Sequence, residues 1–200
     1  MGEKSNAKEQ IVDTAARLFF SQGYHATGLS QIIKESETPK GSLYHYFPNG
    51  KEQLALVCIQ EANKHVTDKF RRTFGKYDKT GDAVYNFVHD MALETEASGY
   101  TGFIPFSFWA AVETSCISDT LRTACKQVFA DWQQIIAERL LLEGASEEQA
   151  QDGGLLTLSM MEGALIISLT NQNNKPLLTA AKYLSMVMKS YGNQPGEQQD

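Results

Sequence analysis

The sequence predicts an all-α protein of about nine helices. Apolar residues recur at helical spacing along almost the whole chain of 200 residues, and no segment shows the apolar–polar alternation of a strand. Capping residues, glycines and prolines lie between the periodic segments, where helices begin and end. With 42% hydrophobic and 21% charged residues, the chain has the composition of a globular protein and the length for a sizeable core.

Two helices are expected before residue 37. The first spans about 5–22, and Gly23 suits the left-handed position that follows a helix. The second lies within 27–36, where Thr27 has the side chain of an N-cap residue.

A short third helix and a long fourth helix follow. Thr38-Pro39 is typical of an N-cap followed by proline at the first helical position, and Phe47-Pro48 must end this helix. Asn49, with Glu52 three residues later, has the spacing of a capping box that opens a helix to about Gly75.

The rest of the chain is expected to be helical as well, with a break at 99–105 and a polar, disordered tail at 193–200. Ser118 and the Ser146–Gln149 pair are the capping signals in this part. The expected helices span about 82–98, 106–115, 118–142, 146–170 and 176–192.

Several protein classes are disfavoured by composition. The first ten residues lack the apolar run of a secretory signal, and Leu155–Leu169 is interrupted by Glu162 and too short to span a bilayer. The three cysteines are odd in number and form no C-x-x-C pair, which disfavours a disulfide framework or a zinc site. We therefore expect a cytoplasmic protein with no membrane partner, no metal and no cofactor.

Charge is divided unevenly along the chain. Residues 1–75 hold ten basic and eight acidic residues, a net +2, whereas residues 76–200 hold eight and sixteen, a net −8. The overall charge of −6 would by itself argue against a nucleic-acid partner, because phosphate contacts require Lys and Arg. The division instead indicates a small basic module attached to an acidic body.

Residues 27–47 have the pattern of a helix-turn-helix, whose second helix enters the major groove of DNA. Lys40 and Ser42 lie on the first turn of that helix, where side chains reach base edges, and Gly41 permits close approach of the backbone. These three residues are the predicted base-reading positions.

Donors for phosphate oxygens follow directly along the chain. Tyr44, His45 and Tyr46 carry hydroxyl or imidazole groups, and Lys51 lies in the first turn of the next helix, whose dipole favours an anion. Packing of Tyr46 on the first helix is an alternative that the sequence leaves open.

Residues 8–56 resemble the DNA-binding domain of the TetR family of bacterial repressors. The similarity also extends through most of the chain to the LmrA/YxaF-like branch of that family. The pattern that carries it comprises Ala15-Ala16-x-Leu18-Phe19, Gly23-Tyr24, Thr27, Lys40-Gly41-x-Leu43-Tyr44, Phe47, Lys51-x-x-Leu54, Glu162-Gly163, Ser168-Leu169-Thr170 and Pro176-Leu177-Leu178.

The resemblance implies that Thr27, Tyr44 and Lys51 anchor phosphates, whereas Leu43 and Phe47 belong to the core. Two departures concern the same region. The family usually has glycine in the turn where this chain has Glu37, and a left-handed conformation there would cost roughly 1 kcal/mol. The family's usual histidine is replaced by Tyr46, with His45 beside it.

An aromatic segment at 100–109 is either a packed core at a helix break or the wall of an apolar cavity for a small molecule. In the TetR family such a cavity holds an inducer, and members of the LmrA/YxaF-like branch are associated with flavonoid-type inducers and drug efflux. The candidate ligand-binding residues are Phe103, Phe106, Trp109, Glu113, Phe129, Trp132, Met160 and Met161.

The helix at 146–170 is apolar on more than one side, as a helix buried from two directions would be. It is predicted to form, with the last helix, a four-helix bundle across a twofold axis, as in the TetR family. A buried monomer core is the alternative. The candidate interface residues are Leu158, Leu165, Leu169, Leu184 and Met188.

These patterns together predict a dimeric transcriptional repressor that binds double-stranded operator DNA and is released by a small aromatic or apolar inducer, flavonoid-like or drug-like. Residues 1–50 would form the DNA-binding domain and 51–192 the ligand-binding and dimerisation domain, with the helix at 51–75 joining them. The alternative is a helical ligand-binding or scaffold protein without specific operator binding. No catalytic motif is present, so we do not expect an enzyme.

Overall fold

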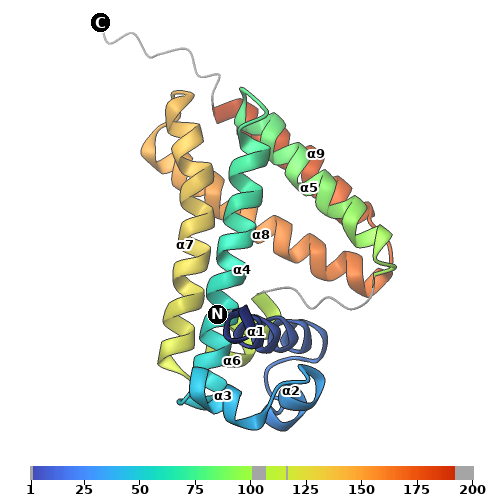
Figure 1. Ribbon diagram of the computed structural model, residues 1–200. Helices are drawn as coiled ribbons and strands as arrows, with labels where there is room; N and C mark the ends of the chain where they lie inside the picture. Colours follow the sequence, from blue (N-terminus) through green and yellow to red (C-terminus); the bar gives the residue numbers. More distant parts are fainter. Residues whose placement is uncertain (1, 101–106, 116, 192–200) are drawn as a thin grey trace, which may run out of the picture. The chain divides into compact units, whose positions relative to one another are not determined.

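The computed structural model describes residues 2–100, 107–115 and 117–191, with side chains for all of these except 2–6, 107–109 and 115. Every regular element in these ranges is helical, which confirms the predicted all-α fold (Figure 1). The elements are α1 (Gly2–Gln22), α2 (Leu29–Glu35), α3 (Lys40–Tyr46), α4 (Gly50–Phe74), α5 (Thr80–Ala97), η1 (Ser107–Val112), α6 (Glu113–Ser115), α7 (Asp119–Leu142), α8 (Glu147–Asn171) and α9 (Lys175–Tyr191).

One predicted helix differs in type. Residues 106–115, expected as a single α-helix, contain the π-helix η1 followed by the single turn α6. A π-helix is rare because its wider turn packs poorly, and such turns occur frequently at functional sites. Within this segment the hydroxyl of Thr114 donates a hydrogen bond to the carbonyl oxygen of Ala110.

The contacts divide the chain into two compact units. The first comprises residues 1–65 and 102–128, and the second comprises residues 66–101 and 129–200. The sequence indicates a single boundary near residue 50, whereas the contacts group α6 and the start of α7 with the N-terminal helices. The helices α4 and α7 therefore contribute residues to both units.

The first unit is built on α1, which packs against α2 and α3. Ile11 and Phe19 of α1, Ile32 of α2 and Leu43 of α3 are fully buried, as is Leu54 near the start of α4. Each buried side chain of this size stabilises the fold by about 1.5–3 kcal/mol, and together they hold the short helices in place.

The first two helix starts after α1 differ from the prediction. The N-cap of α2 is Gly28 and that of α3 is Pro39, and neither has a side-chain cap. The predicted caps point elsewhere: Thr27 is buried in the turn, and the hydroxyl of Thr38 pairs with that of Ser36 at 2.8 Å. The turn geometry therefore outweighs the capping preference of these two threonines.

Other caps agree more closely. Ser146 and Gln149 form the predicted capping box at the start of α8. At the start of α4 the backbone N–H of Asn49 donates to the side chain of Gln53 at 3.0 Å, one residue beyond the predicted Glu52. Glu52 instead accepts a hydrogen bond from the hydroxyl of Ser118 at 2.5 Å.

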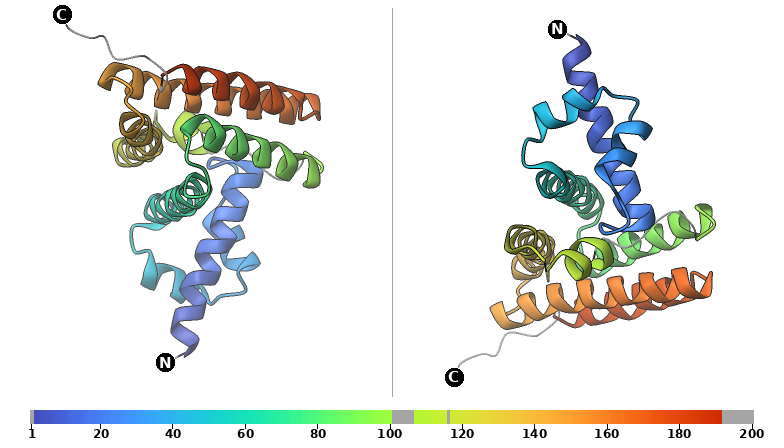
Figure 2. Two further views of the ribbon diagram at one scale, coloured as in Figure 1. Left: turned by 90° about the horizontal axis from the view of Figure 1, so that it is seen from above. Right: turned by 90° about the horizontal axis from the view of Figure 1, so that it is seen from below.

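In the second unit, α9 lies alongside both α5 and α8 (Figure 2). Two glycines permit this close packing. A Cβ atom on Gly81 of α5 would lie 2.8 Å from the carbonyl oxygen of Ser185 on α9, and one on Gly154 of α8 would lie 2.7 Å from that of Gln133 on α7. Neither position has room for a larger residue.

Aromatic rings from three helices form the interior of the second unit. Phe70 of α4 stacks on Phe87 of α5 with ring centroids 3.9 Å apart. Phe74 and Trp132 complete the cluster, at 5.7 Å and 6.4 Å from Phe70. All four side chains are almost fully buried, so this cluster is a main source of the unit's stability.

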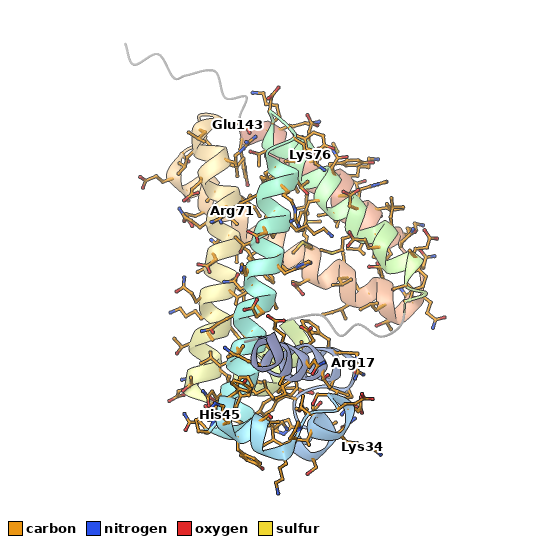
Figure 3. All side chains as sticks on the ribbon, in the orientation of Figure 1. Arg17, Lys34, His45, Arg71, Lys76 and Glu143 are labelled. Atoms are coloured by element: carbon orange, nitrogen blue, oxygen red, sulfur yellow. The ribbon has the colours of Figure 1, made fainter. Side chains whose placement is uncertain are left out.

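A carboxylate closes the turn before α5. Glu143, which follows α7, lies beside the start of α5 in Figure 3 and accepts hydrogen bonds from the backbone N–H of Thr80 at 2.6 Å and from its hydroxyl at 2.5 Å. The guanidinium of Arg139 donates to the carbonyl oxygen of Tyr77 at 2.7 Å. These bonds satisfy backbone groups at a helix start that has no side-chain cap of its own.

Candidate nucleic-acid interface

One side of α3 is exposed and the other is buried. Leu43 is fully buried and Phe47, directly after the helix, is 1% exposed, which fixes the helix on the first unit. Tyr44, in contrast, is 45% exposed, and the Lys40 ammonium lies 5.9 Å from the centre of its ring. We call the exposed side the α3 face; it consists of Lys40, Gly41, Tyr44 and His45.

Gly41 has no structural partner within the protein. A Cβ atom built on it meets no other atom within 4 Å, and its backbone is ordinary right-handed helix. Glycine within a helix costs about 0.5–1 kcal/mol relative to alanine, so the fold alone would favour alanine at this position. No contact within the protein therefore accounts for the glycine.

The structure also separates the two candidates at positions 45 and 46. His45 is exposed on the α3 face, where Figure 3 labels it, whereas Tyr46 is half-buried and has an interaction partner of its own. Their rings meet edge to face, with centroids 5.0 Å apart. Ser42, predicted to face base edges, is half-buried.

Thr27, predicted to anchor a phosphate, is bonded within the protein. Its side chain is fully buried, and its hydroxyl donates to the carbonyl oxygen of Gly23 at 2.7 Å while accepting from the side chain of Gln22 at 3.2 Å. Both bonds hold the turn between α1 and α2 closed. The structure thus shows Thr27 closing this turn, and its role as a phosphate anchor stays a prediction.

Lys51 lies in the first turn of α4, as predicted, and is half-buried. Its ammonium is 4.2 Å from the centre of the Tyr24 ring, a cation–π contact. Burial lowers the pKa of Lys51 below its usual value, and the nearby Glu113 carboxylate opposes this shift.

Tyr24 is a residue whose role the sequence analysis missed. The signal was present in the pattern, because an aromatic residue directly after a helix-ending glycine commonly packs back on the last turn. Here Gly23 is left-handed, at φ 87°, and the Tyr24 ring lies 5.6 Å from that of Phe19.

The turn between α2 and α3 contains the residue at which the sequence departs from the family pattern. Glu37 has φ 53°, the left-handed conformation that favours glycine. Its side chain is exposed. The left-handed conformation whose cost the sequence raised for Glu37 is thus present in the structure.

Replacement of Glu37 with glycine is expected to stabilise the protein. Relief of the left-handed strain exceeds the extra backbone entropy that glycine loses on folding, so Glu37→Gly should raise the free energy of unfolding by about 0.5–1 kcal/mol. Urea denaturation measures this change. Glu37→Ala is the control, since it removes the carboxylate but keeps the Cβ; equal stabilisation by both variants would contradict the explanation.

Comparison with known proteins matches an N-terminal and a C-terminal segment of the chain to one family. Residues 11–58 match the family model of "Bacterial regulatory proteins, tetR family", and residues 80–183 match that of the "Transcriptional regulator LmrA/YxaF-like, C-terminal domain". The chain belongs to the TetR family. This family consists of transcriptional regulators with a helix-turn-helix, and α2 and α3 form that motif here.

Individual relatives support the same assignment over the full length. The chain is 40% identical to the uncharacterized HTH-type transcriptional regulator YxaF of Bacillus subtilis, covering 96% of this chain and all of that protein. It is 35% identical to LmrA of the same organism, covering 92% and 97%. A TetR-family regulator from Streptomyces coelicolor has the same fold, with a TM-score of 0.80 over 94% and 97% of the two chains at 18% identity.

The residues predicted to bind an inducer lie in different parts of this TetR-family chain. Phe103 and Phe106 lie outside the described residues, as does the side chain of Trp109. Trp132 and Phe129 pack edge to face, 5.9 Å apart, with Trp132 in the interior of the second unit.

The remaining three candidates, Met160, Met161 and Glu113, lie in different surroundings. Met161 is buried, whereas Met160 on the same helix lines a surface groove of about 640 Å³ between α8 and α9. Glu113 points to the turn between α1 and α2. Of the five candidates whose side chains are described, Glu113 belongs to the first unit and the other four belong to the second.

The residues proposed for the dimer interface are turned inward. Leu158, Leu165, Leu184 and Met188 are at most 5% exposed, and Leu169 is half-buried. Burial of these side chains within one protomer fits the alternative of a buried monomer core, and their role in a dimer interface stays a prediction. The exposed apolar residues of α8 and α9 are Leu155, Ile166, Ile167, Tyr183 and Met186.

The thiols and potential metal ligands show no reactive arrangement in the described part of the chain. Burial raises the pKa of Cys58 to about 12 and that of Cys125 to about 11, so neither thiol ionises near neutral pH. Cys116 lies outside the described residues. Among the side chains that are described, no group of three or more His, Cys, Asp or Glu residues could hold a metal ion.

Proposed function

We propose that this TetR-family regulator is a ligand-responsive repressor that binds a palindromic operator as a homodimer through the α3 face. The observation that carries the proposal is the α3 face itself. A cation, two hydrogen-bonding side chains and a glycine with free space around it lie together on the exposed side of a helix that Leu43 and Phe47 anchor from behind.

In the proposed complex α3 lies in the major groove, with Lys40 at base edges and the backbone of Gly41 close to them. Tyr44, His45 and Lys51 contact phosphates, which position the helix without reading sequence. Two α3 helices of a dimer would read half-sites about 34–36 Å apart, one turn of B-DNA. The protein would act in the bacterial cytoplasm, where its operator DNA lies.

The inducer is proposed to be a small apolar or aromatic molecule. Support comes from the aromatic side chains of the second unit and from the aromatic-rich segment at 100–109, composition that is typical of ligand cavities between helices. Coupling between the sites is reciprocal: an inducer that weakens operator binding tenfold must itself bind tenfold more weakly to the DNA-bound protein.

Fluorescence anisotropy with DNA from upstream of the protein's own gene tests operator binding. We expect binding in the nanomolar range at physiological salt, at least about a thousandfold tighter than binding to scrambled DNA of equal length. Affinity should fall steeply with salt because Lys51 and its neighbours displace counterions. Equal affinity for both DNAs, with the dimer intact, would instead support a ligand-binding protein without operator specificity.

The proposed dimer rests on the exposed apolar residues of α8 and α9. Ile167 is 50% exposed and lines the groove between these helices, together with Gly163 and Met160. A Cβ on Gly163 would meet nothing within 4 Å, so the protomer itself does not require a glycine inside α8. A second copy packed on this side explains both features, since it would cover the apolar groove and approach the helix closely at Gly163.

Introduction of a charge at the proposed interface is expected to produce a monomer. Ile167→Glu places a carboxylate where the second copy would otherwise exclude water, and burial of an unpaired charge costs several kcal/mol. Analytical ultracentrifugation at micromolar concentration measures the mass. The control Leu142→Glu alters a leucine that is 84% exposed at the end of α7 and should remain dimeric; a dimeric Ile167→Glu variant would contradict the proposed interface.

A further inference from the structure

Glu113 bonds to the backbone of the turn between α1 and α2, although it lies about ninety residues further along the chain. Its carboxylate accepts hydrogen bonds from the N–H of Tyr24 at 2.5 Å and from that of His25 at 3.4 Å. All three residues belong to the first unit. Glu113 thus connects α6 directly to the helices that carry the α3 face.

The end of α1 explains why this carboxylate is needed. The N–H of Gly23 bonds to the carbonyl oxygen of Phe19 at 3.0 Å, the single bond of a helix end with a left-handed glycine. The next N–H, that of Tyr24, then lacks a partner on the helix. Because Tyr24 is 9% exposed, an unpaired N–H there would be costly, and Glu113 supplies the acceptor.

Gly23 provides the space for this contact. A Cβ atom at position 23 would lie 2.5 Å from one oxygen of the Glu113 carboxylate, closer than such atoms can approach. The glycine therefore serves two purposes, since the left-handed turn and the bound carboxylate both exclude a side chain.

The same contact acts on Lys51. Tyr24, whose N–H Glu113 holds, presents its ring to the Lys51 ammonium at 4.2 Å. The negative charge of Glu113 also favours the protonated ammonium against the effect of burial. Glu113 thus bears on Lys51 in two ways, through the ring that Lys51 contacts and through a charge that favours its protonated form.

A second bond ties the same segment to the residue next to Lys51. The hydroxyl of Ser118 donates to the carboxylate of Glu52 at 2.5 Å, and accepts from the backbone N–H of Leu121 at the start of α7. Within the first unit, Glu113 therefore bonds to Tyr24, whose ring Lys51 contacts, and Ser118 bonds to Glu52, the next residue after Lys51.

We propose that Glu113 is a positioning residue for DNA binding, which acts through Tyr24 on Lys51 and makes the phosphate contact of Lys51 dependent on the position of Glu113 in α6. The inference rests on the proposed function, because it assigns a role within operator binding. It also replaces the role predicted for Glu113 in the inducer cavity: the carboxylate serves the DNA-binding unit from outside the helix-turn-helix.

Operator anisotropy measured over a range of salt concentrations tests this role. Glu113→Ala should weaken binding about tenfold and should make the slope of log affinity against log salt shallower by about 2, one phosphate contact for each protomer of a dimer. Glu113→Gln keeps an oxygen acceptor and should restore most of the affinity. The matched control is Glu143→Ala, which removes a carboxylate bonded to a backbone N–H in the second unit and should leave the salt slope unchanged.

A double-mutant cycle separates positioning from a general structural effect. In a Lys51→Met background, Glu113→Ala should cause no further loss of affinity, because the contact on which it acts is already gone. An equal loss in both backgrounds, or no loss in either, would overturn the proposal.

Amide hydrogen exchange in DNA-free protein examines the contact itself. Residues 23–27 should exchange faster in Glu113→Ala than in the wild type, and Glu113→Gln should lie between the two. If the wild type shows no operator specificity, the proposed function fails, whereas the exchange result still reports on the Glu113 contact. Wild-type exchange rates in Glu113→Ala would overturn the proposal whatever the DNA result.

Discussion

Gly41→Leu is expected to abolish tight operator binding while leaving the fold intact. A Cβ at position 41 meets nothing within 4 Å, so the protein itself accommodates a side chain there. In the major groove the same side chain would displace α3 from the base edges at both half-sites. With about 1–3 kcal/mol lost at each, affinity should fall about 30-fold or more.

Stability should change in the opposite direction. Gly41→Ala is expected to raise the free energy of unfolding by about 0.5–1 kcal/mol, because alanine favours the helix, and still to weaken operator binding. Anisotropy and urea denaturation measure the two effects. Ala97→Leu, which adds bulk to an exposed position of α5, is the control and should change neither operator affinity nor stability. If Gly41→Leu bound the operator as tightly as the wild type, the placement of α3 in the major groove would be wrong.

The largest loss of stability is expected for Phe70→Ala. Phe70 is fully buried and contacts Phe74, Phe87 and Trp132, so truncation removes the centre of the aromatic cluster and leaves a cavity. Such substitutions cost about 3–5 kcal/mol. For a chain of this size, the thermal midpoint should fall by roughly 6–20 °C.

Two further variants define the cause of that loss. Phe70→Leu retains most of the volume and should lie between the wild type and Phe70→Ala. Leu142→Ala truncates a leucine that is 84% exposed and should change stability by less than about 0.5 kcal/mol. Scanning calorimetry compares the three, and similar midpoints for Phe70→Ala and Leu142→Ala would show that the aromatic cluster contributes little.

Helix positions were largely predictable because their signals are local. The capping box of Ser146 and Gln149 and the left-handed Gly23 act within a few residues of themselves, and both occur where the pattern indicates. Thr27 shows the limit of such signals. Its hydroxyl could either cap α2 or donate to the carbonyl oxygen of Gly23, and in the buried turn it donates to Gly23.

The exposed side of α3 was predictable to the extent that one helix presents it. Lys40, Gly41 and Tyr44 lie on the exposed side of α3 because Leu43 must point inward, which fixes the rotation of the helix. The pairing of Tyr24 with Glu113 was not predictable in this way. Their contact joins residues 89 positions apart, and local spacing carries no information about such a pair.

For this TetR-family regulator the fold class, the helix positions and the outward side of α3 follow from local sequence patterns, because periodicity and capping operate within a few turns of a helix. The tertiary structure decided which apolar side of α8 is buried, with Leu158 and Leu165 inward and Ile167 outward. It also decided that the Glu113 carboxylate serves the turn after α1. Both outcomes depend on which distant elements meet, since an apolar side chain or a carboxylate suits several environments equally and only the packed neighbours select one.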